Sequence, residues 1–315
     1  MKNKLLKLLC CPKCNAGLGI GKFKSVNSEI KSGIFQCPVC QAEYQIIDFI
    51  PRFVETDKYV KSFSFEWTIH KTTQLDSATG RSESKDTFVE KTGIELEKLR
   101  DKIVLDAGCG MGRFMEVVQP YAKEAVGIDL SFAVNSAYEN LKKFDNLHII
   151  QADVLNLPLK KNSFDYIYSI GVLHHTPDTK KAFMNLAGLL KSGGEIAIWV
   201  YSNEKSYTCI KNKFTDFYRL FTVHIPKKLL WYLSHLAIPF YYFKKIPKVG
   251  TLIDLTFPMS NHCDWKWRVL DTFDWYSPKY QHKHTYREVI HWFKEAGLKD
   301  IELLDFPVAV KGRKQ

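Results

Sequence analysis

The sequence predicts an α/β fold: a mainly parallel sheet with helices on both sides, preceded by a small metal-binding β module. Two observations predict it. From residue 102 onward, short apolar strands alternate with amphipathic helical stripes. Ahead of that point, four cysteines form two Cys-Pro-x-Cys pairs. We therefore divide the chain into residues 1–55, a linker or helical segment at 56–100, and a main domain at 101–315.

The composition is that of a globular protein, with 45% hydrophobic and 25% charged residues among 315. It excludes a disordered, collagen-like or coiled-coil chain. Lys and Arg total 45 against 34 Asp and Glu, and the resulting charge of +11 favours anionic partners. No apolar run reaches the roughly 20 residues of a membrane span, and no secretory leader is visible. We expect a cytoplasmic protein.

The two cysteine pairs predict a metal site. A two-residue gap lets both thiolates of a pair face one ion, so two pairs complete a tetrahedral shell of four sulfurs. Such a shell suits structural Zn²⁺. The predicted ligands are Cys11, Cys14, Cys37 and Cys40. Cys10 competes with Cys11, and we favour Cys11 because Pro12 places it in register with Cys37.

The residues after the second pair read Ala42-Glu43-Tyr44-Gln45-Ile46-Ile47-Asp48-Phe49-Ile50-Pro51-Arg52-Phe53. This stretch resembles the tail of the small zinc-ribbon family that activates RNA and protein methyltransferases. The resemblance covers about residues 4–55 and implies a metal-stabilised β ribbon. Gln45 and Phe49 stand where that family has Pro and Gly. In the segment that follows, we expect one helix near Phe63, Phe65 and Trp67, then a mobile loop over the polar run 72–85.

The main domain reads as five strands with helices between them, at 103–105, 125–129, 147–150, 164–170 and 195–200. A last helix follows at residue 285, where Thr285 and Glu288 form a capping box and Gly297 is the stop. Two more strands are expected at 301–304 and 308–310.

The first strand ends in Asp106-Ala107-Gly108-Cys109-Gly110-Met111-Gly112. A dinucleotide site needs G-x-G-x-x-G, but Arg113 occupies its third position. The run D-x-G-x-G-x-G resembles the class I S-adenosylmethionine methyltransferases instead. Leu157-Pro158-Leu159 and Leu173-His174-His175-Thr176-Pro177-Asp178 resemble their L-H-H branch. The resemblance implies a Rossmann-like sheet of seven strands, the last one antiparallel.

The same resemblance implies the residues that bind the cofactor, S-adenosylmethionine. Asp129 would bind the ribose hydroxyls, Asp106 the methionine ammonium and Asp153 the adenine amino group. The full expected set is Asp106, Gly108, Gly110, Gly112, Asp129, Asp153, Val154 and Ile170. His174 and His175 follow the fourth strand and are candidates for a catalytic base; a structurally packed His pair is the alternative.

An insertion at 202–283, after the fifth strand, is too long for a loop and predicts a helical cap. Residues 201–260 hold 13 of the 43 aromatic residues and nine basic against three acidic ones. Three interpretations stay open: helices packed on the core, peripheral contact of 205–248 with the inner face of a membrane, and a nucleic-acid groove. Residues 271–282 are expected as a loop whose Asp271, Asp274, Tyr276 and His282 contact the methyl acceptor.

We therefore predict an S-adenosylmethionine-dependent methyltransferase with a small-molecule or lipid- or glycan-linked acceptor. An N-P-P-Y-type motif after the fourth strand and a Pro-Cys nucleophile, both typical of base methylation, are absent. The alternative is an RNA methyltransferase that holds phosphates with the zinc ribbon and the basic cap. A non-catalytic scaffold that binds the cofactor is a third hypothesis.

Overall fold

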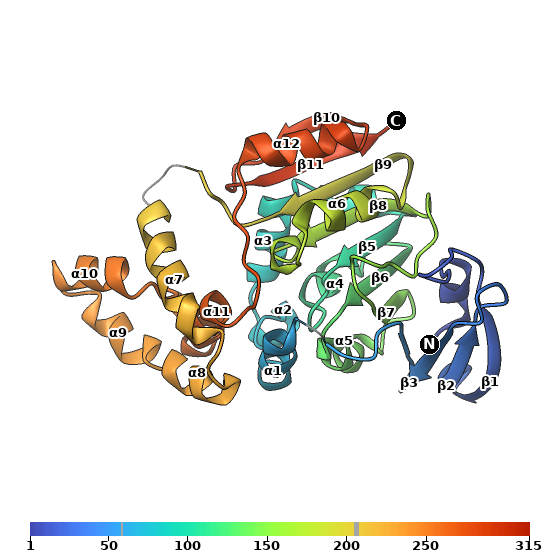
Figure 1. The fold of residues 1–315 in the computed structure, drawn as a ribbon, viewed down its shortest axis with the longest axis horizontal. Coiled ribbons are helices and arrows are strands. Elements are labelled where there is room, and N and C mark those ends of the chain that lie inside the picture. Colours follow the sequence, from blue (N-terminus) through green and yellow to red (C-terminus); the bar gives the residue numbers. More distant parts are fainter. Residues whose placement is uncertain (58, 205–207) are drawn as a thin grey trace.

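One sheet runs through the molecule in the computed structural model, which describes residues 1–57, 59–204 and 208–315 (Figure 1). Over these residues the sheet has eleven strands in the order β1-β2-β3-β4-β7-β6-β5-β8-β9-β11-β10. The strands are β1 Gly19–Val26, β2 Glu29–Gln36, β3 Glu43–Ile47, β4 Ile50–Arg52, β5 Ile103–Ala107, β6 Glu124–Asp129, β7 Leu147–Gln151, β8 Phe164–Ile170, β9 Leu190–Trp199, β10 Leu298–Leu303 and β11 Ala309–Lys314.

Seven neighbouring strands in this order, β7-β6-β5-β8-β9-β11-β10, form the predicted sheet of the main domain. Strands β5 to β9 pair in parallel, and β11 runs antiparallel to both β9 and β10. The prediction of seven strands with an antiparallel last strand is confirmed. All five residues of β7 are buried, which explains why the parallel strands read as continuous apolar runs.

The four N-terminal strands extend this sheet. β4 pairs in parallel with β7 through Arg52 and Gln151. The Arg52 guanidinium donates to Gln151 Oε1 at 2.6 Å and to Asn135 Oδ1 at 2.7 Å. The sequence predicted a β module here but not its continuity with the main sheet, because a junction of so few residues leaves no local pattern.

Helices cover both faces of the central strands (Figure 1). One face packs against Phe88, Met115 and Val134. The other packs against Phe183 and Phe293, whose rings stack 4.6 Å apart. The helices that carry these residues are α3 Glu83–Thr92, α4 Arg113–Val118, α5 Ala133–Leu141, α6 Thr179–Ala187 and α12 Tyr286–Glu295. The predicted capping box at the start of α12 is present.

The crossover from β7 to β8 contains no helix in the structure, whose description of residues 152–163 is complete. A parallel crossover usually carries a helix that covers the sheet. Here the ribbon supplies the cover: Leu5, on the 3₁₀ helix Asn3–Lys7, and Leu9 are buried in the same apolar cluster as Ile150 and Leu159. Leu9 also forms a β-bridge with Leu159.

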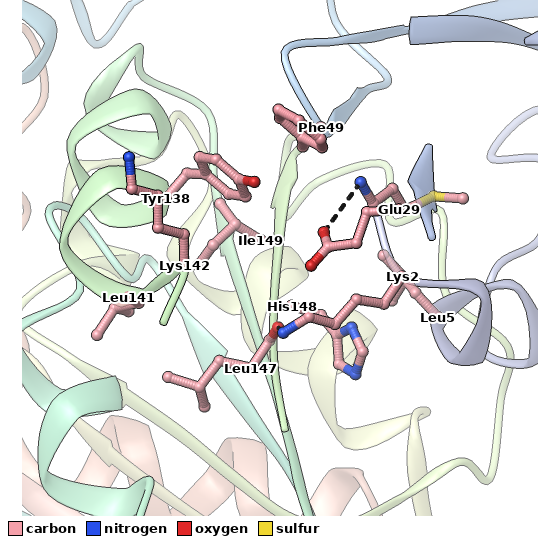
Figure 2. Close-up of a pocket in the computed structure, with 11 residues that line it drawn as sticks. Lys2, Leu5, Glu29, Phe49, Tyr138, Leu141, Lys142, Leu147, His148 and Ile149 are labelled. Atoms are coloured by element: carbon pink, nitrogen blue, oxygen red, sulfur yellow. Dashed lines mark hydrogen bonds and ion pairs between the residues drawn. The ribbon is translucent and has the colours of Figure 1, made fainter. Parts of the chain in front are cut away.

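A small cavity at the seam between the ribbon and the main domain is lined by aliphatic, aromatic and charged side chains (Figure 2). The Lys2 ammonium donates to the carbonyls of Phe144 at 2.5 Å and Leu147 at 3.4 Å. The Phe49 ring stacks on Tyr138 with 5.3 Å between centroids. The ribbon is therefore held by directional contacts as well as by apolar burial.

The segment 56–100 is more ordered than expected. It holds α1 Lys61–Ile69, α2 Asp76–Thr79, α3 and a 3₁₀ turn at Leu96–Leu99. The prediction of a loop over 72–85 is wrong, because the Asp76 carboxylate accepts from the amides of Ser84 and Lys85 at 2.9 Å each. This side chain satisfies amides at the start of α3 and fixes the turn before it.

The insertion after the fifth strand, β9, is helical, as predicted. Its helices are α7 Thr208–Thr222, α8 Lys227–Ser234, α9 Ala237–Phe243, α10 Val249–Thr256 and α11 Trp265–Tyr276. The expected loop that begins at Asp271 is wrong: residues 271–276 are the last part of α11. Asp264 caps that helix by accepting from the amides of Lys266 and Trp267.

No helix in the described part of the chain combines the length and the apolar character that crossing a membrane requires.

Candidate functional site

The four cysteines of the two pairs meet at one point. The Sγ atoms of Cys11, Cys14, Cys37 and Cys40 all lie within 4.8 Å of one another, with 3.5 Å between Cys11 and Cys40. Four thiolates bound at about 2.3 Å around one tetrahedral ion lie about 3.8 Å apart. The donor set and its spacing fit Zn²⁺.

The two turns that carry these cysteines have the same backbone pattern. The Cys11 and Cys37 carbonyls each accept from the amide four residues later, and both of those residues, Asn15 and Gln41, have positive φ. Cys11 is thus the structural counterpart of Cys37. Cys10 lies outside the cluster, and its amide donates to the Pro158 carbonyl at 3.0 Å.

A cavity of about 370 Å³ lies at the carboxyl ends of β5 to β9, under α11 and α1. Ligands of open α/β sheets bind at this edge. Its walls divide into two halves: the strand ends with the glycine loop, and the aromatic and ionisable side chains of α1, α3, β9 and α11.

The glycine loop after β5 brings backbone to the cavity wall. Gly108 has a φ of 93°, and a Cβ there would lie 2.3 Å from the Val172 side chain, so only glycine fits. The amide of Gly110 donates to Asp129 Oδ2 at 2.9 Å. Both glycines line the cavity, whereas Gly112 packs against Leu141 outside it.

Asp129, the last residue of β6, faces the cavity with its carboxylate fixed. Its Oδ1 accepts from the Ser131 amide at 2.8 Å and from the Ser131 hydroxyl at 2.6 Å. Burial raises the pKa of Asp129, and these hydrogen bonds with that of Gly110 oppose the rise. Oδ2 accepts only from the Gly110 amide and therefore keeps lone-pair capacity for a ligand.

Of the other residues expected at the cofactor, Val154 and Ile170 line the cavity, while Asp106 and Asp153 do not. Asp153 Oδ1 accepts from the Leu155 amide at 3.0 Å and from the Tyr59 hydroxyl at 3.1 Å. Asp106 is fully buried, which raises its pKa, and its Oδ2 has no hydrogen-bond partner among the described residues.

The two histidines on the 3₁₀ turn Leu173–His175 are packed. His174 stacks on Tyr201 with 3.9 Å between centroids and does not line the cavity. His175 lines it, and its Nδ1 lies 2.8 Å from the Tyr280 carbonyl, which requires an N–H there and leaves Nε2 as an acceptor. Burial lowers the pKa of His175 to about 3, so it is neutral at pH 7 and a weak base.

The second half of the cavity gathers three carboxyl groups, from Glu66 on α1 and from Asp271 and Asp274 on α11. Burial raises the pKa of Asp271 to about 6 and, together with the charge of Asp271, that of Asp274 to about 7. Burial also raises the pKa of Glu66 well above its usual range. Glu66 Oε2 and Asp274 Oδ1 have no hydrogen-bond partner within the described chain.

Aromatic and basic groups surround these carboxyls. The Tyr201 hydroxyl donates to Asp274 Oδ2 at 3.3 Å. The Lys91 ammonium lies 3.4 Å from the centroid of Trp199, and burial lowers its pKa to about 7. Arg113, also in the wall, is nearly buried and lies 4.9 Å from the ring of Trp267.

Only two of the four residues predicted to contact the acceptor lie in the cavity wall. Asp271 and Asp274 line the cavity, but Tyr276 and His282 do not. The Tyr276 hydroxyl donates to the Pro258 carbonyl at 2.6 Å, and the His282 amide to the His174 carbonyl at 2.9 Å. These two hydrogen bonds instead fix backbone segments next to the cavity.

Sequence reasoning missed Glu66, Lys91, Tyr201 and Arg113 as cavity residues. The position of Glu66 between Phe65 and Trp67 was a signal, because a carboxylate flanked by aromatic residues on a helix can be carried into an apolar surface. Lys91 carried no such signal, since its burial depends on how α3 packs against β9.

The part of the chain that supplies the glycine-loop half of the cavity matches known methyltransferases. Residues 105–198 match the family described as "Methyltransferase domain". A tRNA U34 carboxymethyltransferase of Pseudoalteromonas atlantica is 32% identical over 113 residues, which cover 35% of each chain. An O-methyltransferase, rstn1, of Aspergillus nomiae is 29% identical over 116 residues, 35% of this chain and 52% of that one. The chain thus spans about a third to a half of the length of these curated relatives.

Among solved structures, a complex of the Haloferax volcanii Trm112 methyltransferase activator with a putative methyltransferase is 14% identical. It covers 80% of this chain and 96% of that one, with a TM-score of 0.47.

Proposed function

On the premise that residues 105–198 are a class I methyltransferase domain, we propose that this protein transfers methyl groups from S-adenosylmethionine to a small acceptor that carries a hydroxyl or an amine. The acceptor is a free small molecule or the head of a lipid- or glycan-linked one. The observation that carries the proposal is a single cavity with a glycine-loop half and a carboxyl-rich half.

The glycine-loop half suits the cofactor. Gly108 and Gly110 would let its carbon chain approach the backbone, and Asp129 would accept from the ribose hydroxyls. Val154 and Ile170 would border the adenine and the methionine portion. Asp106, whose orphaned Oδ2 needs a donor, would hold the methionine ammonium through an intervening water. Asp153 would support the adenine side from outside the wall.

When bound, S-adenosylmethionine supplies a methyl group already activated by its sulfonium, so alignment of the acceptor contributes much of the rate. Glu66 and Asp274 favour an acceptor with hydrogen-bond donors, because buried oxygens without partners are costly until a ligand satisfies them. Trp199, Tyr201 and Trp267 would bury its remaining surface.

Asp274 is better suited than either histidine to remove a proton from the acceptor. A general base works best with a pKa near the working pH, and that of Asp274 is raised to about 7. With its pKa near 3, His175 would instead accept a hydrogen bond through Nε2 and orient the acceptor.

RNA is the second candidate acceptor. Two observations favour it: several curated relatives are named tRNA U34 carboxymethyltransferases, and the net charge is +11. Neutralising phosphates with lysines would make RNA affinity fall steeply with salt.

One experiment separates these acceptors. The protein is incubated with methyl-labelled S-adenosylmethionine and a cell extract divided into small-molecule, lipid-and-glycan and RNA fractions. We expect label in one of the first two fractions, lost with Asp129→Ala and kept with Asp145→Ala, which changes an exposed aspartate away from the cavity. Label in the RNA fraction alone would identify RNA, and not a small molecule, as the acceptor. No label in any fraction would contradict methyl transfer.

A further inference from the structure

The cap exposes large apolar side chains that no part of the described chain covers. We name them the cap patch: Phe217, Leu220 and Phe221 on α7, Tyr242 and Phe243 at the end of α9, Leu252 on α10, and Phe257 just after it. Phe217 and Phe221 are 56% and 62% exposed. A soluble monomer rarely exposes contiguous apolar surface of this kind without a use for it.

Ring contacts join the patch across three segments. Phe221 contacts Phe217, which contacts Tyr218, with 5.8 Å and 5.7 Å between centroids. Tyr218 stacks on Phe257 at 5.5 Å. Phe257 in turn lies 6.3 Å from Phe240 of α9, a neighbour of Phe243. Through the half-buried rings of Tyr218 and Phe240, four exposed rings form one chain of contacts in the helical region at one end of the molecule (Figure 1): Phe217, Phe221, Phe243 and Phe257.

Exposed lysines outnumber exposed acids on the same helices, where Asp216 is 54% exposed and paired with Lys283. Lys213, Lys245 and Lys248 are exposed, and Lys213 lies on the face of α7 that carries Phe217, four residues on. The two acids between residues 208 and 257 both face lysines: Asp216 is 2.6 Å from Lys283, and Asp254 is 2.7 Å from Lys244. The patch thus combines apolar rings with a positive rim.

We propose that the cap patch docks this protein on the surface of an anionic lipid bilayer. Amphipathic helices with Phe, Leu and Tyr on one face and lysines beside them lie in the interface of such membranes. The rings would enter the boundary between headgroups and acyl chains, while the lysines would attract anionic headgroups.

This docking would bring the acceptor half of the cavity near lipid. α11 packs against α7, α8 and α9 and also supplies Asp271 and Asp274 to the cavity wall. α11 therefore links two of the helices that carry the cap patch, α7 and α9, to the carboxyl-rich half. This last step rests on the proposed function and favours a lipid-linked acceptor; the docking itself does not depend on methyl transfer.

Vesicle co-sedimentation tests the docking with the full chain. We expect the protein to sediment with vesicles of phosphatidylcholine and phosphatidylglycerol, to stay in solution with phosphatidylcholine alone, and to be released by salt. The double variant Phe217→Ser, Phe221→Ser should bind at least about tenfold more weakly. Lys245→Glu with Lys248→Glu should lose the preference for phosphatidylglycerol.

The matched control is Phe23→Ser on β1 of the ribbon, which removes a phenylalanine exposed to 55% and should leave vesicle binding unchanged. Thermal melting and S-adenosylhomocysteine affinity of every variant show whether the fold and the cofactor half are intact. They also separate a failure of docking from a failure of the proposed function.

Three results would overturn the proposal. The first is that the wild type does not sediment with anionic vesicles, and the second is that the Phe217, Phe221 double variant binds them as well as the wild type does. The third is that the patch serves another occupant: a dimer in analytical ultracentrifugation, or an RNA complex, that the double variant abolishes while vesicle binding persists.

Discussion

At the scale of single residues, the site divides into positions that follow from local sequence and positions that follow from packing. Gly108 and Asp129 could be predicted to lie at the cavity, because Gly108 follows β5, Asp129 ends β6, and strand ends meet at one edge of a parallel sheet. Lys91 could not, because the packing of α3 brings it there from outside the strand–helix pattern, and for Glu66 on α1 the flanking aromatic residues were the one signal.

Asp274 gives the proposed mechanism its pH dependence. Its pKa is raised to about 7, so the carboxyl is protonated and cannot accept a proton at pH 5. We expect kcat/KM to rise with pH through about 7 and then level. Asp274→Asn should lower kcat roughly 100-fold and remove that rise.

The control is Asp145→Asn, an exposed aspartate whose change should preserve the profile. A wild-type pH profile retained in Asp274→Asn would assign the base elsewhere. A loss of S-adenosylhomocysteine affinity as large as the loss of kcat would mean that Asp274→Asn disturbs the cavity as a whole.

At the scale of elements, the strands and the last helix follow from apolar pattern and capping residues. α12 begins at the predicted Thr285 and Glu288 box because both residues satisfy amides at the helix start. α11 was missed because its dense aromatic and polar residues show no simple amphipathic stripe. Its helical form depends on Asp264 at its N-cap and on burial of Trp267 and Phe273.

The cap of α11 offers a test of how the acceptor half is positioned. Asp264→Ala removes the acceptor for the Lys266 and Trp267 amides and should cost about 1 kcal/mol of unfolding free energy. Because α11 carries Asp271 and Asp274, we expect KM for the acceptor to rise while S-adenosylhomocysteine affinity, measured calorimetrically, stays unchanged.

Thr285→Ala is the matched control, since it removes the cap of α12 at similar cost but lies outside the cavity wall. An equal rise of the acceptor KM in both variants would indicate general destabilisation and contradict a positioning effect of α11.

At the scale of the whole molecule, the ribbon completes the main domain. Its Leu5 and Leu9 cover the helix-free crossover between β7 and β8, and β4 adds to the edge of β7. The cysteine spacing was sufficient to predict a metal site. This cover could not be predicted, because it depends on where the ribbon docks.

Loss of the metal should therefore destabilise both the ribbon and the main domain. Cys14→Ser breaks the four-sulfur cluster, and we expect loss of bound zinc, a lower melting temperature and weaker S-adenosylhomocysteine binding. Cys263→Ser changes an exposed cysteine outside the cluster and should retain all three properties. A zinc-free Cys14→Ser protein with wild-type melting and affinity would assign the ribbon to substrate recognition instead.

The methyl-transfer proposal requires that the glycine-loop half of the cavity binds S-adenosylmethionine. Calorimetric titration of the full, zinc-loaded protein with S-adenosylhomocysteine tests it most directly, with Asp129→Ala beside Asp145→Ala. We expect one site per chain in the wild type and in Asp145→Ala, and affinity reduced by at least about tenfold in Asp129→Ala, which loses charge-assisted hydrogen bonds. No binding to the folded wild type, or equal binding to Asp129→Ala, would contradict it.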